Sequence, residues 1–100
     1  MHADPLLPQL ADLFRLLGDT TRLRIVLACL QGPVAVGDIA ARLELAPTLV
    51  SHHLRLLRAA RLVKSERQGR HVLYSTADQH VARMLGDMLE HIAEPSGALE

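Results

Sequence analysis

Apolar residues recur every three or four positions in four stretches of the first 62 residues. This spacing is typical of helices that bury one face, so the pattern predicts four amphipathic helices. Gly18 ends the first stretch, Gly32-Pro33 ends the second, and Pro47 suits the first turn of the fourth. The predicted helices cover residues 5–18, 19–33, 34–45 and 46–62. The stripe of the fourth that should face inward is Leu49 or Val50, Leu54 and Leu57.

Beyond residue 62 the pattern changes to alternation of apolar and polar positions. Residues 62–67 and 70–76 alternate in this way, which predicts two short strands joined by a turn at Gln68-Gly69. A last helical stretch runs from about Asp78 to Ala93 and is stopped by Pro95. The expected fold is therefore mainly α with a β-hairpin (α+β), in the order ααααββα.

Composition limits the class of protein. The chain has 100 residues, of which 49% are apolar, with one Phe, one Tyr and no Trp, and this favours packed helices. We expect one domain over residues 1–100, with an ordered core over about 8–95 that would gain from a partner subunit. The start has no basic segment followed by an apolar one, and no apolar run approaches the ~20 residues of a membrane span. Together with the single cysteine, this predicts a cytoplasmic protein.

Charge is distributed unevenly along the chain. The formal net charge is zero, which alone argues against a nucleic-acid binder. However, residues 55–70 contain six basic side chains against the single acid Glu66, and from residue 78 onward five acids stand against Arg83. The protein should therefore have a basic face and an acidic tail. The six basic residues are Arg55, Arg58, Arg61, Lys64, Arg67 and Arg70.

The basic segment coincides with a predicted DNA-reading unit. The helices over 34–45 and 46–62, with a short turn between them, resemble a helix-turn-helix, and the hairpin would be its wing. Solvated polar faces would explain each feature alone, but the combination favours binding of double-stranded operator DNA. We read His53 as a structural residue. The candidate DNA-binding residues are Thr48, Ser51, His52 and Arg55 in the second helix, and Arg67, Gln68 and Arg70 at the hairpin tip.

Three segments resemble the ArsR/SmtB family of metal-sensing bacterial repressors: "LGDTTRLRIVLACL", "VGDIAARLELAPTLVSHHLRLLRAARLV" and "RQGRHVLYS". The resemblance covers about residues 8–95. It implies a homodimeric winged helix-turn-helix repressor, with the first and last helices forming the dimer interface. It also implies that the metal-free dimer binds operator DNA and that metal binding releases it.

The resemblance further implies where metal would bind. One family type uses a Cys-x-Cys pair at the start of the third helix, but Ala35 stands where a cysteine would be needed. Another type uses the last helix, with Asp-x-His near its start and His-x-x-Glu near its end. Asp78, His80, His91 and Glu94 match that version, which resembles the zinc sensors.

Helix geometry explains why each pair of candidate ligands is only half a site. His80 and His91 are eleven residues apart, about 1100° at 100° per residue, so they share a face but lie ~16 Å apart along the axis. An antiparallel partner helix would bring His91 and Glu94 beside Asp78 and His80, forming two sites per dimer. An apolar stripe that borders the ligands would hold the two helices in register; it contains Val81, Met84, Leu85, Met88, Leu89 and Ile92.

Two nitrogen and two carboxylate ligands suit tetrahedral Zn(II), and Co(II) would also fit. Ni(II) prefers more ligands, which His2 and the N-terminal amine could supply, although we favour the interpretation of His2 as part of a disordered terminus. Alternatively, Asp78 is only a helix cap, or a capping box from Thr76 to Gln79 starts the helix earlier.

We therefore predict a zinc-responsive repressor of metal efflux or detoxification genes. The alternative is a repressor of the same fold that senses Ni(II), Co(II) or a redox signal. Cys29 lies among apolar residues and is better explained as a buried thiol than as a redox sensor. We expect no enzyme activity, because four protein ligands leave no open coordination position and 100 residues leave little room for a substrate cleft.

Overall fold

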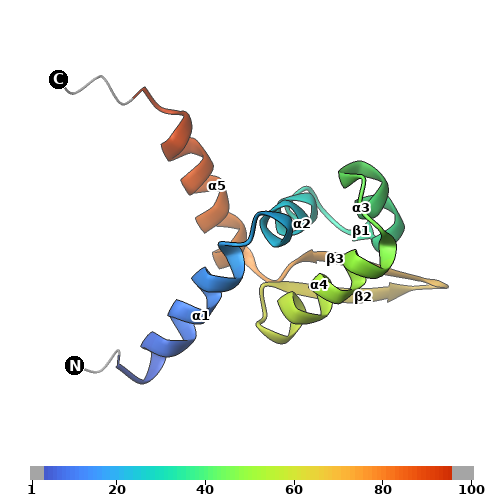
Figure 1. Ribbon diagram of the computed structural model, residues 1–100, viewed down its shortest axis with the longest axis horizontal. Helices are drawn as coiled ribbons and strands as arrows, with labels where there is room; N and C mark the ends of the chain where they lie inside the picture. Colours follow the sequence, from blue (N-terminus) through green and yellow to red (C-terminus); the bar gives the residue numbers. More distant parts are fainter. Residues whose placement is uncertain (1–3, 96–100) are drawn as a thin grey trace.

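The computed structural model describes residues 4–95 as five α-helices and a three-stranded antiparallel sheet (Figure 1). This is the predicted winged helix-turn-helix, and the fold class is confirmed. In chain order the elements are the 3-10 turn η1 (Asp4–Leu6), α1 (Leu7–Leu17), α2 (Thr20–Leu30), β1 (Val34–Ala35), α3 (Val36–Leu43), α4 (Pro47–Ala59), β2 (Val63–Gln68), β3 (His71–Thr76) and α5 (Gln79–Ala93).

The strand β1 corrects the predicted order ααααββα. Val34 and Ala35, which we expected to begin a helix, instead pair with Tyr74 and Leu73 of β3, giving the sheet order β1-β3-β2. A strand of two residues is too short to show alternation, and its pairing partner lies about forty residues further along the chain. The helical spacing begins only at Val36.

The wing turn also differs from the prediction by one residue. Gln68 pairs with His71, so the two turn residues are Gly69 and Arg70 and not Gln68 and Gly69. Gly69 has a φ of 61°, the left-handed conformation that a type II′ hairpin turn requires at its first position and that glycine adopts without steric cost. Gln68 therefore ends β2, and Arg70 lies at the tip.

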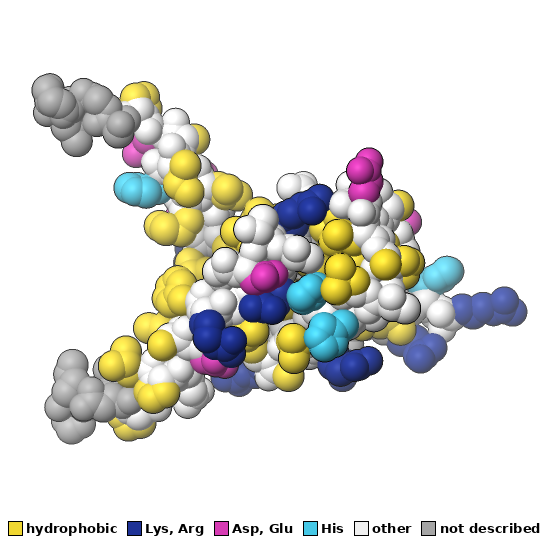
Figure 2. Space-filling view, viewed as in Figure 1, with side chains coloured by type: hydrophobic (Ala, Val, Ile, Leu, Met, Phe, Trp, Pro, Cys, Tyr) yellow, Lys and Arg dark blue, Asp and Glu magenta, His cyan; other side chains and the backbone are white. Residues whose placement is uncertain are grey.

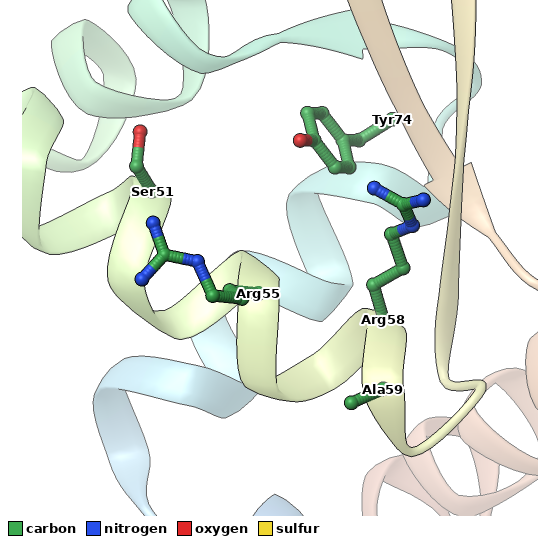
Figure 3. Close-up of a pocket in the computed structure, with 5 residues that line it drawn as sticks. All are labelled: Ser51, Arg55, Arg58, Ala59 and Tyr74. Atoms are coloured by element: carbon green, nitrogen blue, oxygen red, sulfur yellow. The ribbon is translucent and has the colours of Figure 1, made fainter.

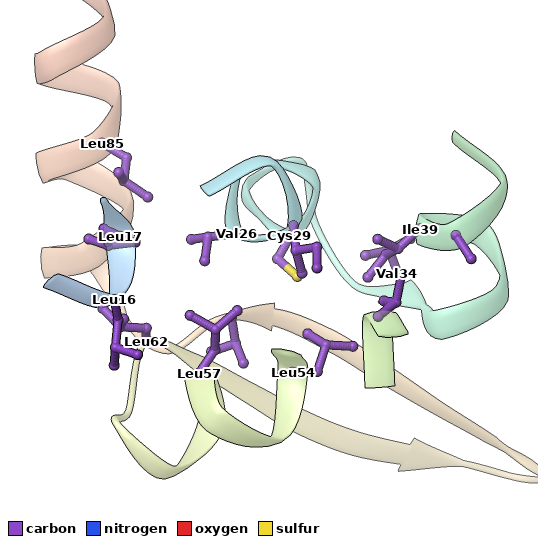
Figure 4. Close-up of a cluster of buried hydrophobic side chains, with 14 residues drawn as sticks. Leu16, Leu17, Val26, Cys29, Val34, Ile39, Leu54, Leu57, Leu62 and Leu85 are labelled. Carbon is purple, nitrogen blue, oxygen red and sulfur yellow. The ribbon is translucent and has the colours of Figure 1, made fainter. Parts of the chain in front are cut away.

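The core lies between α2, α4 and the sheet, with contributions from α1, α3 and α5 (Figure 4). Of the two candidates for the inward stripe of α4, Val50 is buried and Leu49 is 40% exposed, so Val50 is the inward residue. Asp19 caps α2 by accepting a hydrogen bond of 2.9 Å from the Arg22 N–H, as expected for an acidic residue at a helix start. The buried core residues are Leu16, Leu17, Ile25, Val26, Cys29, Val34, Ile39, Ala40, Val50, Leu54, Leu57, Leu62, Val63 and Leu85.

The helices α1 and α5 diverge from one side of this core, so that the two described ends of the chain lie far apart (Figure 1). The wing extends on the opposite side. The molecule is consequently elongated, with extents of 52 × 36 × 21 Å. Within residues 4–95, every helix is too short or too polar to cross a bilayer.

Candidate DNA-reading face and metal half-sites

The turn between α3 and α4 sets the angle of the reading helix. Glu44 ends α3 in the left-handed conformation, with a φ of 58°, and the Leu45 N–H donates a hydrogen bond of 3.0 Å to the Ala40 carbonyl. Pro47 then occupies the first turn of α4, where its missing N–H costs nothing. The short linker and the buried residues Val50 and Leu54 hold α4 against the core and leave its other face free.

All of the predicted DNA-binding side chains are exposed. Thr48, Ser51, His52 and Arg55 lie on the outer side of α4. At the far end of the wing, basic side chains gather at the tip (Figure 2). These positions suit contact with DNA, and the contacts themselves remain predictions. The exposed residues of the tip are Arg67, Gln68 and Arg70.

His53, the neighbour of His52, lies on the inner side of α4. Its ring is half-buried, and within residues 4–95 its Nδ1 atom is buried without a hydrogen-bond partner. Burial lowers the pKa of His53 below its ordinary value of 6.5, although the nearby Asp19 carboxylate opposes this shift. The two histidine rings meet edge-on with centroids 5.7 Å apart. This placement fits the interpretation of His53 as structural.

An open cleft of about 490 Å³ lies between α4 and β3 (Figure 3). Its lining includes two predicted DNA-binding residues, Ser51 and Arg55, and two residues that were not predicted as site residues, Arg58 and Tyr74. The i, i+3 spacing of the two arginines could have identified Arg58, because it places both on one helix face. Tyr74 could not be found in this way, because only the folded sheet brings it beside α4.

The first candidate half-site lies at the start of α5. Asp78 is the N-cap, and its Oδ1 accepts a hydrogen bond of 3.0 Å from the Val81 N–H. The helix thus starts at Gln79, as favoured, and the alternative capping box from Thr76 is wrong because Thr76 belongs to β3. Capping and metal binding are compatible, since one carboxylate oxygen can cap while the other binds an ion.

Asp78 and His80 line one surface depression of about 520 Å³ at the corner between α4, β2 and α5. Arg61 and Lys64 line the same depression. Their positive charges oppose the binding of a cation, so a site here would need carboxylates to balance them.

The second candidate half-site lies at the other end of α5. His91 is in the last turn, Glu94 follows as the C-cap, and both are exposed. Among residues 4–95, no three His, Cys, Asp or Glu side chains converge closely enough to hold a metal ion. A single chain therefore presents two incomplete pairs.

An apolar surface separates the two half-sites. On α5, Leu85 is buried in the core, whereas Met88 and Leu89 are about half exposed and Ile92 is 76% exposed. The facing side of α1 is similarly apolar, with Phe14 55% exposed, and Figure 2 shows apolar side chains along both helices. We call this surface, made of Leu6, Leu7, Leu10, Phe14, Met88, Leu89 and Ile92, the apolar arm surface.

Cys29 is buried in α2 and is 1% exposed. Burial raises the pKa of its thiol to about 11, so it is protonated at neutral pH. Since the thiolate is the reactive form, this thiol is poorly suited to redox sensing or metal binding. The interpretation of Cys29 as a core residue fits this environment.

Comparison with known proteins decides the family. Residues 19–65, which include the whole helix-turn-helix, match the description "Bacterial regulatory protein, arsR family". The transcriptional regulator CmtR of Mycobacterium tuberculosis is 46% identical over 81 residues, which are 81% of this chain and 69% of that protein. The chain belongs to the ArsR family. As an ArsR-family protein it is a DNA-binding transcriptional regulator and not an enzyme.

Other relatives agree with this assignment. A transcriptional repressor SmtB homolog of Synechocystis is 42% identical over 86 residues, which are 86% of this chain but only 65% of that relative. The solution structure of the cadmium metal-sensor CmtR is 41% identical, with a TM-score of 0.71, over 85% of this chain and 94% of that chain. The homodimeric winged helix-turn-helix domain of a possible ArsR-family regulator from Mycobacterium bovis is 30% identical, with a TM-score of 0.82, over 93% of this chain and 86% of that one.

Proposed function

We propose that this ArsR-family protein is a homodimeric repressor that binds operator DNA without metal and releases it when Zn(II) binds. Each zinc would be held by Asp78 and His80 of one subunit and by His91 and Glu94 of the other. One observation carries the proposal: α5 has two complementary ligand pairs at opposite ends, with exposed apolar side chains between them. Residues 1–100 would act as a single domain in the cytoplasm, and the regulated genes would serve metal efflux or detoxification.

The apolar arm surface supports the dimer. Exposed apolar side chains along two helices that extend from one core are typical of a protein-protein interface. A two-fold axis that pairs α5 with its copy in antiparallel orientation would bury Met88, Leu89 and Ile92 and align opposite ends of the two helices. The Mycobacterium bovis relative is homodimeric, which also supports this arrangement.

The nature of the ligands supports zinc. Two imidazoles and two carboxylates suit tetrahedral Zn(II), whereas cadmium, a softer ion, favours thiolates. The relatives include a cadmium metal-sensor and a cadmium resistance regulatory protein, so metal sensing itself is well represented among them. In this chain, however, the single cysteine is buried in α2. When bound, zinc would bridge the two subunits by coordinating ligands from both.

The corner between α4 and α5 offers a route from the metal to the DNA reader. The Ala77 N–H donates a hydrogen bond of 3.1 Å to the Leu62 carbonyl, tying the start of α5 to the end of the reading unit. Arg61, with a φ of 61°, lines the same depression as His80. The second ring nitrogen of a ligand histidine usually donates to a carbonyl or carboxylate, and here the Arg61 carbonyl would accept. Couplings of this kind are about 1–3 kcal/mol.

Zinc titration of the complex with DNA tests the proposal. Fluorescence anisotropy with DNA from upstream of the protein's own gene should show release by zinc for the native protein. His80→Ala and His91→Ala should bind the DNA equally well but remain bound when zinc is added. Glu90→Gln, which removes an exposed carboxylate from the same helix, is the matched control and should still be released. Normal zinc release of both histidine variants would contradict the proposal.

The alternative effectors make different predictions. Ni(II) or octahedral Co(II) would give six-coordinate spectra, whereas the proposed site should give a tetrahedral Co(II) spectrum with two ions per dimer. His2, the additional ligand considered for nickel, lies outside the described residues. A redox signal acting through Cys29 is disfavoured by its burial and raised pKa.

A further inference from the structure

The cleft between α4 and β3 has the chemistry of an anion-binding site. Its lining contains two guanidinium groups, from Arg55 and Arg58, and two hydroxyl groups, from Ser51 and Tyr74, with no carboxylate (Figure 3). Within residues 4–95, neither arginine forms an ion pair. Two charged donors and two neutral donors around one opening can together replace the water around a phosphate group.

The sheet register turns Glu66, the one acid of the hairpin, away from the cleft. Ser65 pairs with Tyr74, and Glu66 pairs with Leu73. Since successive side chains of a strand point to opposite faces, Glu66 lies on the face opposite to Tyr74. Arg67, two residues beyond Ser65, lies on the same face as Tyr74 and carries the positive charge on toward the wing tip. The cleft therefore has exposed basic side chains on α4 and, further along the sheet, on the wing.

The cleft also continues the predicted DNA-reading stripe. Ser51, Arg55 and Arg58 follow one another at i, i+4 and i+7, so they share one face of α4. The first two face the cleft and belong to the predicted reading residues. A DNA strand lying along this stripe would bring a phosphate to the opening, and phosphate groups accept most hydrogen bonds in protein–DNA complexes.

We propose that this cleft is a phosphate clamp, in which Arg58 from the reading helix and Tyr74 from the wing sheet hold the same DNA phosphate. The inference rests on the proposed DNA-binding function and adds two residues to it. A phosphodiester that contacts both Arg58 and Tyr74 fixes the positions of the reading helix α4 and the wing relative to each other and to the duplex. A tilt of the subunits that moves the phosphate away from either residue would then weaken both contacts together.

The test is DNA affinity as a function of salt. Each phosphate contact contributes about 0.9 to the slope of log K against log salt concentration, so Arg58→Ala should reduce the slope by close to 2 per dimer. Its affinity should fall about tenfold or more. Tyr74→Phe keeps the ring but removes a neutral donor, so it should bind about threefold more weakly with an unchanged slope. Arg83→Ala removes the same charge from the exposed side of α5 and is the matched control.

A second measurement identifies the phosphate. Individual phosphates of the operator are replaced by neutral methylphosphonates and the affinity is measured for the native protein and both variants. At one position per half-site, the replacement should lower the DNA affinity of the native protein. It should have little further effect on the DNA affinity of Arg58→Ala or Tyr74→Phe. If no single position couples to both residues, or if Arg58→Ala keeps the slope of Arg83→Ala, the clamp is wrong.

The outcomes separate this inference from the wider proposal. If the native protein does not bind DNA, the proposed function fails. If it binds DNA and the variants behave like the control, only the clamp fails. A free anion could use the same donors, so inorganic phosphate is titrated into the DNA-free protein at constant ionic strength. Saturable phosphate binding that is lost in Arg58→Ala but does not compete with DNA would overturn the assignment of the cleft to a DNA phosphate.

Discussion

The reading unit, made of α3, α4 and the wing, and the two outer helices α1 and α5, here called the arms, differ in how much of their apolar surface is buried. In α3, α4 and the wing, most large apolar side chains are buried or half-buried, and only Leu49 and Leu56 of α4 are 40% and 39% exposed. In α1, α5 and the turn η1 that precedes α1, seven large apolar side chains remain exposed, and the candidate metal ligands form two separate pairs. The difference indicates that the reading unit forms its core within one chain, whereas the arms need a second copy of the chain to cover their apolar side chains.

The largest expected effect distinguishes core from surface within α4. Leu54 is 1% exposed, so Leu54→Ala should lower the free energy of unfolding by about 2–5 kcal/mol through lost burial and a residual cavity. Leu49→Ala removes the same atoms from an exposed position and should cost less than about 1 kcal/mol. Urea denaturation at one fixed subunit concentration measures both. Equal losses of unfolding free energy would contradict the placement of Leu54 in the core and of Leu49 on the surface.

The next effect concerns the arms. Ile92→Glu places a charge in the apolar arm surface, and desolvating that charge should weaken dimerisation by at least a hundredfold. The helical content of the monomer should be unchanged, because Ile92 is exposed in the single chain. Sedimentation equilibrium gives the dissociation constant, with Arg83→Glu on the other side of α5 as the control. A dimer that tolerates Ile92→Glu would place the interface elsewhere.

A smaller effect separates the two roles of Asp78. Asparagine is as good an N-cap as aspartate but carries no charge. Asp78→Asn should therefore preserve thermal stability while lowering zinc affinity tenfold or more, since even partners outside the coordination sphere can contribute that much. Asp78→Ala should lose both properties. Competition with a chromophoric chelator measures the affinity, and zinc binding by Asp78→Asn at native strength would mean that this residue is only a cap.

The smallest effect is a pH dependence within the reading unit. Because burial lowers the pKa of His53, the unfolded chain takes up a proton before the folded chain does. Stability should therefore be complete above pH 6.5 and should fall as the pH drops through that value. His53→Gln should flatten this part of the stability curve, which urea denaturation at a series of pH values measures. The lowered pKa of Asp19, caused mainly by the hydrogen bond from the Arg22 N–H, reduces stability in a separate, more acidic range, as the pH falls through 3.8 and below.

Local chemistry made much of this fold predictable. Gly18 and Pro47 mark helix limits where expected, and Asp78 caps α5, because each effect depends on neighbours within one helical turn. The helical spacing likewise identified the apolar stripe of α5 and the separation of its ligand pairs. These features depend on rotation and rise per residue, which do not change with the rest of the fold.

Long-range pairing was not accessible in the same way. The strand β1 forms because Val34 pairs with Tyr74. The cleft forms because the folded sheet places Tyr74 beside α4. The choice between Leu49 and Val50 as the inward residue also depended on the angle at which α4 meets the core. Helix periods and caps follow from forces between residues a few positions apart, so the order of residues alone settles them. The cleft and the exposed arms arise from contacts whose free energy appears only when distant segments pack together, and they became visible only in three dimensions.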